Sequence, residues 1–395
     1  MKKILLIIID GLGDELIPEL GGKTPLEAAR KPNLDFLAKN GLCGLVKPWT
    51  ERGKLPTSED THLAIFGYSP KKHNPGRGVL EALGIGMKIL PDDICLRGNF
   101  ATINEKTMEI IDRRAGRIEE TKDLIKAISD IEIEGVKLLI AKGISHRFAL
   151  ILRGKNLSFK ISSNDPKLTG VKPLTIKPLE KTKKAQFTAK ILNQFLEKTH
   201  FILKTYPLNK KRKLPANYIL VRGAGKLKKI KNFKEKYNLK SAFISGGMLY
   251  KGIGRFLGME EIKVKGATGL VNTNLKGKIL TAKTALRKYD FIFLHIKAAD
   301  NLAEDGNFFG KKEFLEKIDK NLKPLLYLKN ILIVVTGDHS TCSLLKQHCF
   351  EPIPILIFGA EKDRVFEFSE KKCQNGNLGI FPQLKLMSKI LRYAK

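Results

Sequence analysis

The amino-acid sequence predicts an α/β protein, in which a doubly wound, mostly parallel sheet is interrupted by a smaller inserted α+β domain. Three apolar runs, Ile4–Ile9, Phe291–Leu294 and Ile331–Val335, are rich in leucine and β-branched residues. Continuous apolar runs of this length are typical of strands that are buried on both faces of a parallel sheet. Between the first run and the other two, residues 101–184 change to short alternating segments with polar turns, which indicates a separate domain.

The segment after the first strand predicts helices joined by loops. Thr24 followed by Pro25 predicts a helix start, because threonine caps a helix N-terminus and proline fits the first turn. A second helix is expected within residues 32–41, which end in an Asn-Gly pair common after helices. The polar stretch Leu55–Asp60 predicts a loop that turns into a further helix.

The inserted region is expected to contain strands before the chain returns to the core. Phe148–Leu152 and Leu157–Ile161 predict two of these strands. A helix is expected over Lys184–Glu197 and a core strand at Tyr218–Val221, after which α/β alternation resumes. With 395 residues, 43% of them apolar, the chain is long enough for two domains. The expected domains are a core of residues 1–100 and 185–395 and an inserted domain of residues 101–184.

Each of the three predicted buried strands leads to a side chain that is able to bind a metal. In open α/β sheets, ligands bind beyond the carboxyl ends of the strands, and carboxylates and imidazoles there suit a pair of divalent cations. A single aspartate after a strand is more often a helix cap. Three of them, with histidines nearby, favour a metal site. The strand-end residues are Asp10, His295, Asp300, Asp338, His339 and His348.

Ser58 is the candidate nucleophile. It lies where a loop enters a helix, so free backbone N–H groups and the helix dipole would face a bound phosphate. The same position suits a helix cap, with Glu59 and Asp60 in the first turn. A hydroxyl is a poor nucleophile unless a base or a metal activates it, so two metals nearby would favour the catalytic role.

Basic side chains in the middle of the chain predict an acidic substrate. Arg113, Arg114 and Arg117 lie within five residues. Arginine binds carboxylate and phosphate through two parallel hydrogen bonds. A single arginine is as often a solvated surface residue as an anion-binding one, but three arginines so close together favour an anion site. Further candidates are Arg97 and the His146-Arg147 pair.

The composition predicts a cytoplasmic enzyme. Five cysteines form no CxxC pair, and their odd number argues against a disulfide framework. The first apolar run is too short for a signal peptide or a membrane span. The net charge of +32 raises a nucleic-acid role, but no zinc-finger spacing, aromatic RNA-binding motif or basic recognition helix accompanies it. A positive field is better suited to attracting a small polyanionic substrate.

A further pattern consists of seven stretches: Asp10-Gly11, Pro56–Tyr68, Gly76–Gly84, Arg97–Thr102, Asp112–Arg117, His295–Ala298 and Thr336–Thr341. Together they resemble the archaeal-type cofactor-independent phosphoglycerate mutases of the alkaline phosphatase superfamily. The stretches follow the family's order and, with the residues around them, extend from Asp10 to about Pro354. As a set they are specific, whereas the Asp-His pair alone would indicate only the superfamily.

The resemblance implies a phosphatase-like core with two divalent metals and an inserted domain that closes over the substrate. Ser58 would take the phosphoryl group from 3-phosphoglycerate to form a phosphoserine. The retained glycerate would reorient, and its other hydroxyl would recover the group as 2-phosphoglycerate, without bisphosphoglycerate. Metals and arginines stabilise charge in such a transfer.

The resemblance also implies residue roles. One metal would be bound by Asp10, Ser58, Asp338 and His339, and the other by Asp300, Glu304 and His348. Lys297 would join Ser58 in catalysis. The substrate would contact Arg97, Asp112, Arg113, Arg117, His146 and Arg147.

Glu304 departs from the family pattern, which usually reads His-Asp-Gly where this chain reads Glu-Asp-Gly. A carboxylate adds negative charge and favours manganese or magnesium over zinc or cobalt. Glu304 follows Asp300 by one helical turn, so both are able to face one metal. The alternative is that Glu304 does not replace the histidine as a ligand, which would leave the second metal site empty and disable the chemistry. Cys342 stands where proline is common, but His348 keeps its spacing from Asp338.

Other functions stay open from the sequence. A metal-dependent phosphatase or another phosphomutase would share the serine and both metals, although the arginines of the insertion favour the mutase. A non-catalytic paralogue is supported only by Glu304, and a nucleic-acid-binding protein only by the net charge. No membrane partner is expected, and an oligomer is compatible with the sequence.

Overall fold

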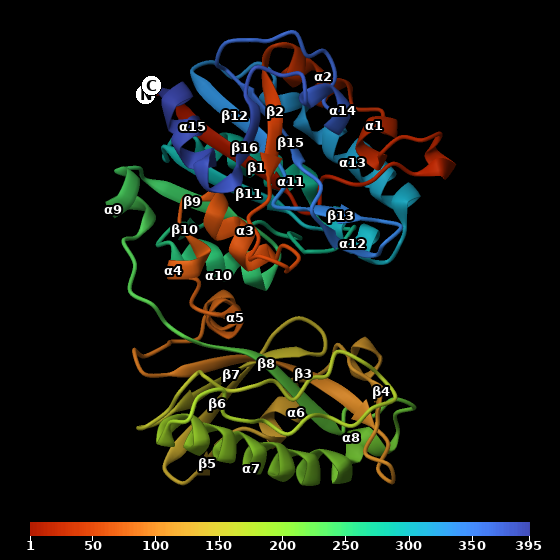
Figure 1. The fold of residues 1–395 in the computed structure, drawn as a ribbon, viewed down its shortest axis with the longest axis vertical. Helices are drawn as coiled ribbons and strands as arrows, with labels where there is room; N and C mark the ends of the chain where they lie inside the picture. The colour runs from red at the N-terminus through yellow and green to blue at the C-terminus, as the bar shows by residue number, and fades with distance from the viewer. The chain divides into compact units, whose positions relative to one another are not determined.

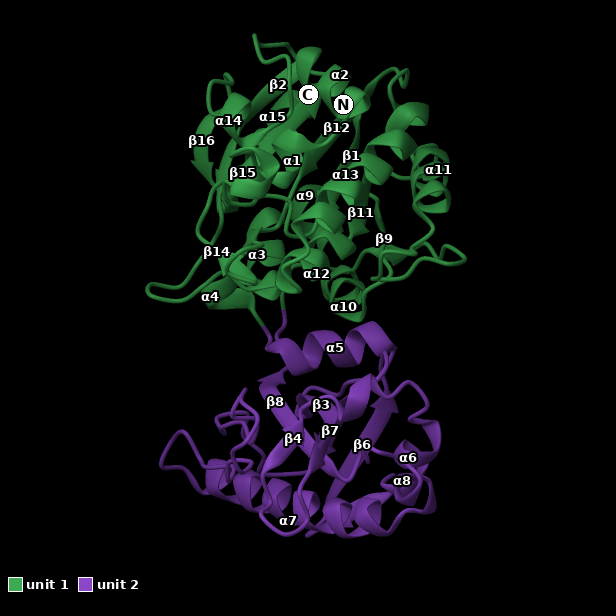
Figure 2. Cartoon of the chain, turned by 90° about the vertical axis from the view of Figure 1, so that its right-hand side faces the viewer, with its two compact units in different colours: residues 1–74, 230–395 green, residues 75–229 purple.

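The chain folds as two units, each built on its own sheet. The structure is a computed structural model that describes residues 1–395. Unit 1 comprises residues 1–74 and 230–395, and unit 2 comprises residues 75–229 (Figures 1 and 2). The expected boundaries at 101 and 184 are therefore corrected, because the flanking segments pack within unit 2. None of the helices combines the length and the apolar character needed to cross a membrane.

Unit 1 contains an eight-stranded sheet in the order β10-β9-β11-β1-β12-β15-β2-β16. Its centre is formed by β1 (Lys3–Ile9) between β11 (Phe291–Ile296) and β12 (Ile331–Thr336), all three parallel. These are the three predicted strands, and Ile4–Ile9 are completely buried. Only β15 runs antiparallel to its neighbours, so the mostly parallel sheet is confirmed. The other strands are β2 (Gly41–Lys47), β9 (Ser241–Ile244), β10 (Glu260–Glu261), β15 (Ile353–Phe358) and β16 (Gly379–Pro382).

Helices cover both faces of this sheet, which confirms the doubly wound fold (Figure 1). One face carries α1 (Pro25–Ala28), α2 (Pro32–Lys39), α11 (Leu275–Ala285), α12 (Ala298–Glu304) and α13 (Phe308–Leu322). The other carries α3 (Ser58–Ile65), α4 (Pro70–His73), α10 (Met248–Phe256) and α15 (Leu386–Ala394). Unit 1 also contains α9 (Phe233–Tyr237), α14 (Glu370–Cys373) and the 3-10 helices η1 (Pro18–Leu20), η3 (Lys323–Leu325) and η4 (Gln383–Lys385).

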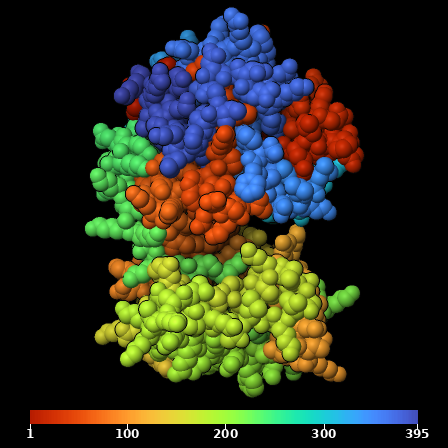
Figure 3. Space-filling view, in the orientation of Figure 1, coloured from red at the N-terminus to blue at the C-terminus, as the bar shows by residue number.

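The predicted helix starts are present in unit 1. The hydroxyl of Thr24 accepts a hydrogen bond from the Glu27 N–H at 3.0 Å, so Thr24 caps α1 as expected. Helix α2 ends before Asn40, in agreement with the Asn-Gly signal. Segments from both ends of the chain share the surface of this unit, as the red-to-orange and blue atoms of Figure 3 show. The Lys2 N–H even donates to the Ala394 carbonyl, at 2.7 Å.

A short antiparallel hairpin follows β12 and contains a disulfide. It consists of β13 (Ser340–Cys342) and β14 (Gln347–Cys349), and Cys342 is bonded to Cys349 across it. The sequence argument against disulfides is wrong at this pair, because the hairpin brings the two Cα atoms to 5.8 Å. Pairing of β13 with β14 brings these two cysteines together, and a count of cysteines does not reveal that pairing. The other three cysteines are free and buried.

Unit 2 is an antiparallel α+β domain, as predicted for the insertion. Its strands are β3 (Ile94–Ile103), β4 (Ile110–Asp112), β5 (Ile131–Ile133), β6 (Val136–Lys142), β7 (Arg147–Arg153) and β8 (Tyr218–Lys226). Its helices are α5 (Arg77–Ile85), η2 (Ala115–Arg117), α6 (Lys122–Ala127), α7 (Lys183–Thr205) and α8 (Pro207–Lys210).

The sheet of unit 2 is covered on both faces by helices. In β7, Phe148, Leu150 and Leu152 point into the cluster formed with α7, whereas Ala149 and Ile151 point into the cluster formed with α5. Strand β8 pairs with β3, so it belongs to this sheet and not to the core sheet as predicted. The strand predicted at Leu157–Ile161 is wrong, because only Ile161 makes an isolated bridge there.

Candidate metal centre

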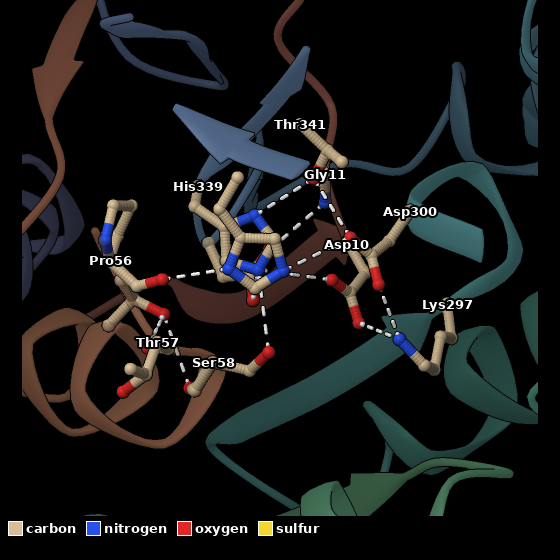
Figure 4. A network of polar contacts seen from close by, with 12 residues as sticks. Asp10, Gly11, Pro56, Thr57, Ser58, Lys297, Asp300, His339 and Thr341 are labelled. Atoms are coloured by element: carbon tan, nitrogen blue, oxygen red, sulfur yellow. Dashed lines mark hydrogen bonds and ion pairs between the residues drawn. The ribbon is translucent and has the colours of Figure 1, made fainter. Parts of the chain in front are cut away.

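The strand ends of unit 1 bring the predicted ligands to one edge of the sheet. Asp10 follows β1 directly, and Asp338 and His339 follow β12, its neighbour. All three side chains are fully buried. Because parallel neighbouring strands end at the same edge, residues more than 300 positions apart in the sequence lie in contact here (Figure 4).

The first ligand group has the composition of a cation site. His339 Nε2 lies 3.2 Å from Asp338 Oδ2, 3.6 Å from Asp10 Oδ1 and 3.4 Å from Ser58 Oγ. Asp10 Oδ1 and Asp338 Oδ2 are buried without a hydrogen-bond partner. Unpaired buried carboxylate oxygens are costly, so their convergence on an imidazole nitrogen fits a divalent cation.

The second ligand group lies beside the first. Asp300, His339 and His348 are close enough to share an ion, and His348 Nε2 is 3.5 Å from Asp300 Oδ1. His348 Nδ1 donates to the Pro56 carbonyl at 2.7 Å, which leaves Nε2 for a metal. Glu304 lies at the rim: its Oε1 is 3.9 Å from His348 Nε2 and its side chain is 52% exposed.

Three carboxylates share the site with the ammonium of Lys297. Lys297 Nζ lies 2.6 Å from Asp300 Oδ2 and 3.4 Å from Asp10 Oδ2. Burial raises the pKa of Asp338 well above its usual range, and repulsion from Asp10 and Asp300 adds to the shift. Burial alone would raise the pKa of Asp10 and of Asp300 as well. Lys297 and the neighbouring histidines, His295 beside Asp10 and His348 and His339 beside Asp300, together lower both pKa values. A bound cation would stabilise the ionised form of all three carboxylates.

The imidazoles are suited to bind metal. Burial lowers the pKa of His339 to about 3, and His348 is the next cause. Burial likewise opposes the charged form of His348, but its contact with Asp300 raises the pKa overall. A neutral imidazole is the form that binds a metal, and the buried His339 is already in that form near neutral pH.

Ser58 is free of the capping role that was its alternative explanation. Thr57, not Ser58, is the N-cap of α3, and its hydroxyl accepts from the Asp60 N–H at 3.4 Å. Ser58 is the first helical residue, is 6% exposed and points its hydroxyl at His339 (Figure 4). The hydroxyl is therefore available to a ligand or a substrate.

Several residues at this site escaped the sequence arguments. Tyr250 of α10 donates a hydrogen bond to Asp10 Oδ2, and its ring stacks on His295 with centroids 3.5 Å apart. Thr341 Oγ1 donates to Asp300 Oδ1 at 2.8 Å and lies 3.1 Å from His339 Nδ1. Thr341 belongs to the Thr336–Thr341 stretch, of which only the Asp-His pair was predicted to act at the site. Nothing in the sequence around Tyr250 indicates its contact with Asp10.

His295 was expected among the metal ligands because it lies at a strand end, but it lies outside both ligand groups. Its Nε2 is 3.4 Å from Asp10 Oδ2, behind the oxygen that faces the ligand group. Neither of its ring nitrogens has a hydrogen-bond partner. His62 is equally buried, and its Nδ1 donates to the Ser58 carbonyl at 2.8 Å. Both rings line the back of the site and have lowered pKa values, about 4 and about 3, chiefly because of burial.

The predicted substrate residues gather in unit 2 around a buried histidine. Burial lowers the pKa of His146 to about 3, and the positive charges of Arg147, Arg97, Arg114 and Arg117 lower it further. Arg97 is 8% exposed, with its Nη1 3.7 Å from Glu81 Oε1. The cluster is therefore strongly positive, with Arg97 buried and Arg114 and Arg117 exposed, and arginines of this kind suit an anion site.

Two further predicted residues lie at the border of this cluster. Arg113 forms two hydrogen bonds with Asp165, at 2.9 and 2.8 Å. Asp112 accepts from the Arg114 N–H at 2.5 Å, so its carboxylate orders the arginine-rich turn. The sequence arguments missed Arg222, whose Nη1 is 3.0 Å from Asp165 Oδ2, because it comes from a strand assigned to the core.

Comparison with known proteins gives a consistent result. Residues 38–209 match the family model described as 2,3-bisphosphoglycerate-independent phosphoglycerate mutase. Enzymes of that name from Archaeoglobus fulgidus and Methanocaldococcus jannaschii are each 44% identical to the chain, over 95% of it and 94% or 93% of their own length. A solved structure of a cofactor-independent phosphoglycerate mutase from Thermoplasma acidophilum superposes with a TM-score of 0.71 at 35% identity, with all of both chains covered. A Pyrococcus horikoshii protein gives 0.85 at 32% identity, covering all of this chain and 97% of its own.

Proposed function

Because the chain belongs to the 2,3-bisphosphoglycerate-independent phosphoglycerate mutase family, it is an isomerase that interconverts 3- and 2-phosphoglycerate, and we propose that the candidate metal centre performs this reaction through a phosphoserine on Ser58. The observation that carries the proposal is the convergence of Ser58 Oγ, His339 Nε2 and two unpaired carboxylate oxygens in one buried site.

Two divalent metals, manganese or magnesium by preference, fit the two ligand groups. Such metals lower the pKa of a bound hydroxyl and stabilise charge on a transferring phosphoryl group. The oxygen-rich ligand set, with Glu304 in place of an imidazole, favours these harder cations. The proposed ligands are Asp10, Ser58, Asp338 and His339 for one metal and Asp300, Glu304 and His348 for the other.

In the proposed reaction, Ser58 Oγ attacks the phosphorus of 3-phosphoglycerate and loses its proton. The bond from phosphorus to the C3 oxygen breaks, and the glycerate takes up a proton there. The C2 hydroxyl of the retained glycerate then attacks the phosphorus of the phosphoserine and loses its proton. The bond from phosphorus to Ser58 Oγ breaks, and Oγ takes up a proton. Lys297, which contacts Asp10 and Asp300, is the residue proposed to bind the phosphoryl oxygens.

The arginine cluster of unit 2 is proposed to hold the anionic groups of the substrate. Its members Arg97, Arg113, Arg117 and Arg147 carry charge. Asp112 orders the arginine-rich turn, and His146 is buried beside the arginines; both are proposed to line the substrate site. The phosphoglycerates have a carboxylate and a phosphate, both of which suit bidentate binding by arginine. Because these metabolites are intermediates of central carbon metabolism, we also propose a cytoplasmic location.

The test is an enolase-coupled assay on purified protein with 3-phosphoglycerate and no bisphosphoglycerate. Apo protein reconstituted with manganese or magnesium should produce 2-phosphoglycerate, with little release of inorganic phosphate. Phosphate release without isomerisation would instead indicate a phosphatase. Brief incubation with substrate labelled in its phosphoryl group, followed by acid quench and mass spectrometry, should place the label on Ser58. A label elsewhere would contradict the assignment of the nucleophile.

A further inference from the structure

Lys311 is a buried cation outside both ligand groups. It lies on α13 with no exposed surface. Its ammonium donates to Asp14 Oδ2 at 2.7 Å, to the Gly13 carbonyl at 3.0 Å and to the Thr341 carbonyl at 3.1 Å. An ammonium has three donors and no acceptor, so each N–H has one partner here.

The partners of Lys311 belong to the two segments that carry the metal ligands. Gly13 and Asp14 continue the chain from Asp10, and Thr341 continues it from His339. Asp14 also accepts from the backbone N–H of Ser343 at 2.8 Å and from its hydroxyl at 2.5 Å. Lys311 and Asp14 therefore join the segment after β1 to the segment after β12.

The connection continues into the ligand groups themselves. Thr341 accepts from Lys311 with its carbonyl and donates with its hydroxyl to Asp300, while it also contacts His339. Its backbone N–H donates to the Gly13 carbonyl at 3.0 Å. One residue thus couples the Lys311 ammonium to ligands of both proposed metals.

The two segments are packed so closely that small shifts are transmitted. A Cβ on Gly11 would lie 2.6 Å from Thr341 Oγ1, and one on Gly13 would lie 2.0 Å from Ser340 Oγ. Only glycine fits at such approaches. Removal of the ammonium that holds these segments together would let them separate, because the buried Asp14 carboxylate would be left without its counter-charge.

A second buried lysine, Lys31, forms ion pairs that do not involve the segments of the metal ligands. Lys31 is 3% exposed and lies 3.5 Å from Asp35 Oδ1 and 3.2 Å from Glu367 Oε1. It belongs to unit 1 as Lys311 does, but none of these partners belongs to a ligand segment. Lys31 therefore provides a matched control for the loss of a buried cation.

We propose that Lys311 is a positioning residue for the metal centre, which fixes Asp10 relative to His339 and Asp300 through Asp14 and Thr341. The proposal rests on the proposed metal centre and adds to it a residue that touches neither metal nor substrate.

The test compares Lys311→Met with Lys31→Met. Methionine preserves most of the side-chain volume in both and removes the charge. Manganese affinity is measured by calorimetric titration of the apo proteins, and the melting temperature of each apo protein is measured in parallel. Partners behind metal ligands typically contribute 10–100-fold to affinity, so Lys311→Met should bind manganese at least about tenfold more weakly. Lys31→Met should lose melting temperature but keep its affinity within about twofold.

Asp14→Asn is the milder second variant, in case Lys311→Met does not fold. It keeps the size of the side chain and one acceptor oxygen but removes the negative charge, while the Lys311 ammonium keeps its two carbonyl partners. An affinity between those of wild type and Lys311→Met is therefore expected. Equal loss of affinity in the Lys31 and Lys311 variants, or unchanged affinity in both the Lys311 and Asp14 variants, would overturn the proposal. Wild-type protein that binds no divalent cation would overturn the proposed metal centre, and the inference with it.

Discussion

Ser58 and Thr57 are adjacent hydroxyl residues at the start of α3 with different tasks. Thr57 caps the helix, and Ser58 turns its hydroxyl toward His339. Ser58→Ala should therefore keep the fold, with a melting temperature close to that of wild type, and reduce mutase turnover at least about a thousandfold. The enolase-coupled assay measures this.

Thr57→Ala is the matched control for Ser58→Ala. It should cost about 1 kcal/mol of stability through the lost cap and leave the Ser58 hydroxyl, the proposed nucleophile, in place. Turnover above a few per cent of wild type in Ser58→Ala would remove Ser58 from the mechanism.

Glu370 makes stability depend on pH. Burial raises its pKa to about 7, while the Thr24 hydroxyl donates to it at 2.7 Å. Because the folded-state pKa lies above the unfolded value, the folded protein binds the proton more tightly. The associated stability is present at low pH and is lost as pH rises toward about 7.

Glu370→Gln should remove this dependence. At pH 5 its free energy of unfolding should equal that of wild type, and at pH 8 it should exceed wild type by on the order of 1–3 kcal/mol. Urea unfolding at both pH values measures the difference. A variant that is equally destabilised at both would contradict the raised pKa.

Glu304 tests the second ligand group. Glu304→Ala should lose one metal and most activity, although the half-exposed position of the side chain predicts a smaller loss than Asp300→Ala. Glu304→His should stay active and shift its preference toward zinc or cobalt, because imidazole is a softer ligand than carboxylate. Metal analysis after dialysis measures the occupancy. Unchanged stoichiometry in Glu304→Ala would exclude Glu304 as a ligand.

The hairpin of β13 and β14 carries His348 and is closed by the Cys342–Cys349 disulfide. Closure of so short a loop restricts the unfolded chain by roughly 2–3 kcal/mol in the loop-entropy model. Cys342→Ser with Cys349→Ser should lower the melting temperature and weaken the metal bound by Asp300 and His348. Calorimetric titration and thermal unfolding measure both effects. Cys43→Ser, which removes a free buried cysteine, is the control.

The elements that were predictable from the sequence are those whose signal is local. β1, β11 and β12 are continuous apolar runs, and the strand-end rule identified Asp10, Asp300 and Asp338 without any knowledge of contacts. Helix α7 and strand β8 were recognised as elements but assigned to the wrong domain. An amphipathic helix or a strand packs equally well on either of two sheets, and its pattern does not name the partner.

The residues that escaped prediction depend on contacts distant in sequence. Tyr250 and Lys311 come from helices that the motifs do not include, and only the folded sheet brings them to Asp10 and Asp14. The disulfide depends on hairpin register, to which a count of cysteines is blind. A sequence thus indicates candidate ligands at strand ends more readily than the side chains that surround them.

Unit 2 contains the arginine cluster and also an arginine–aspartate pair outside it, so the anion-binding role of the cluster is tested against a matched control in the same unit. Arg113→Ala should lower kcat/KM roughly a hundredfold, on the order of 2–3 kcal/mol for one charged contact. Arg153→Ala breaks an equivalent pair, with hydrogen bonds to Asp93 at 3.0 and 2.7 Å, at the opposite end of β7 from Arg147. It should leave kcat/KM nearly unchanged. Equal kcat/KM in the two variants and wild type would refute the anion role of Arg113.

Because β1 pairs with β11 and β12, the central part of the core sheet is able to form only late in synthesis on the ribosome. Unit 2 is one continuous segment, so it is able to fold while the rest of the chain is still being made. β1 leaves the ribosome first, but its neighbours in the sheet start only at Phe291 and Ile331. The apolar Ile4–Ile9 must therefore wait through most of translation, a period in which chaperones would protect it from aggregation. The set of proposed metal ligands is complete only once His348 has been synthesised.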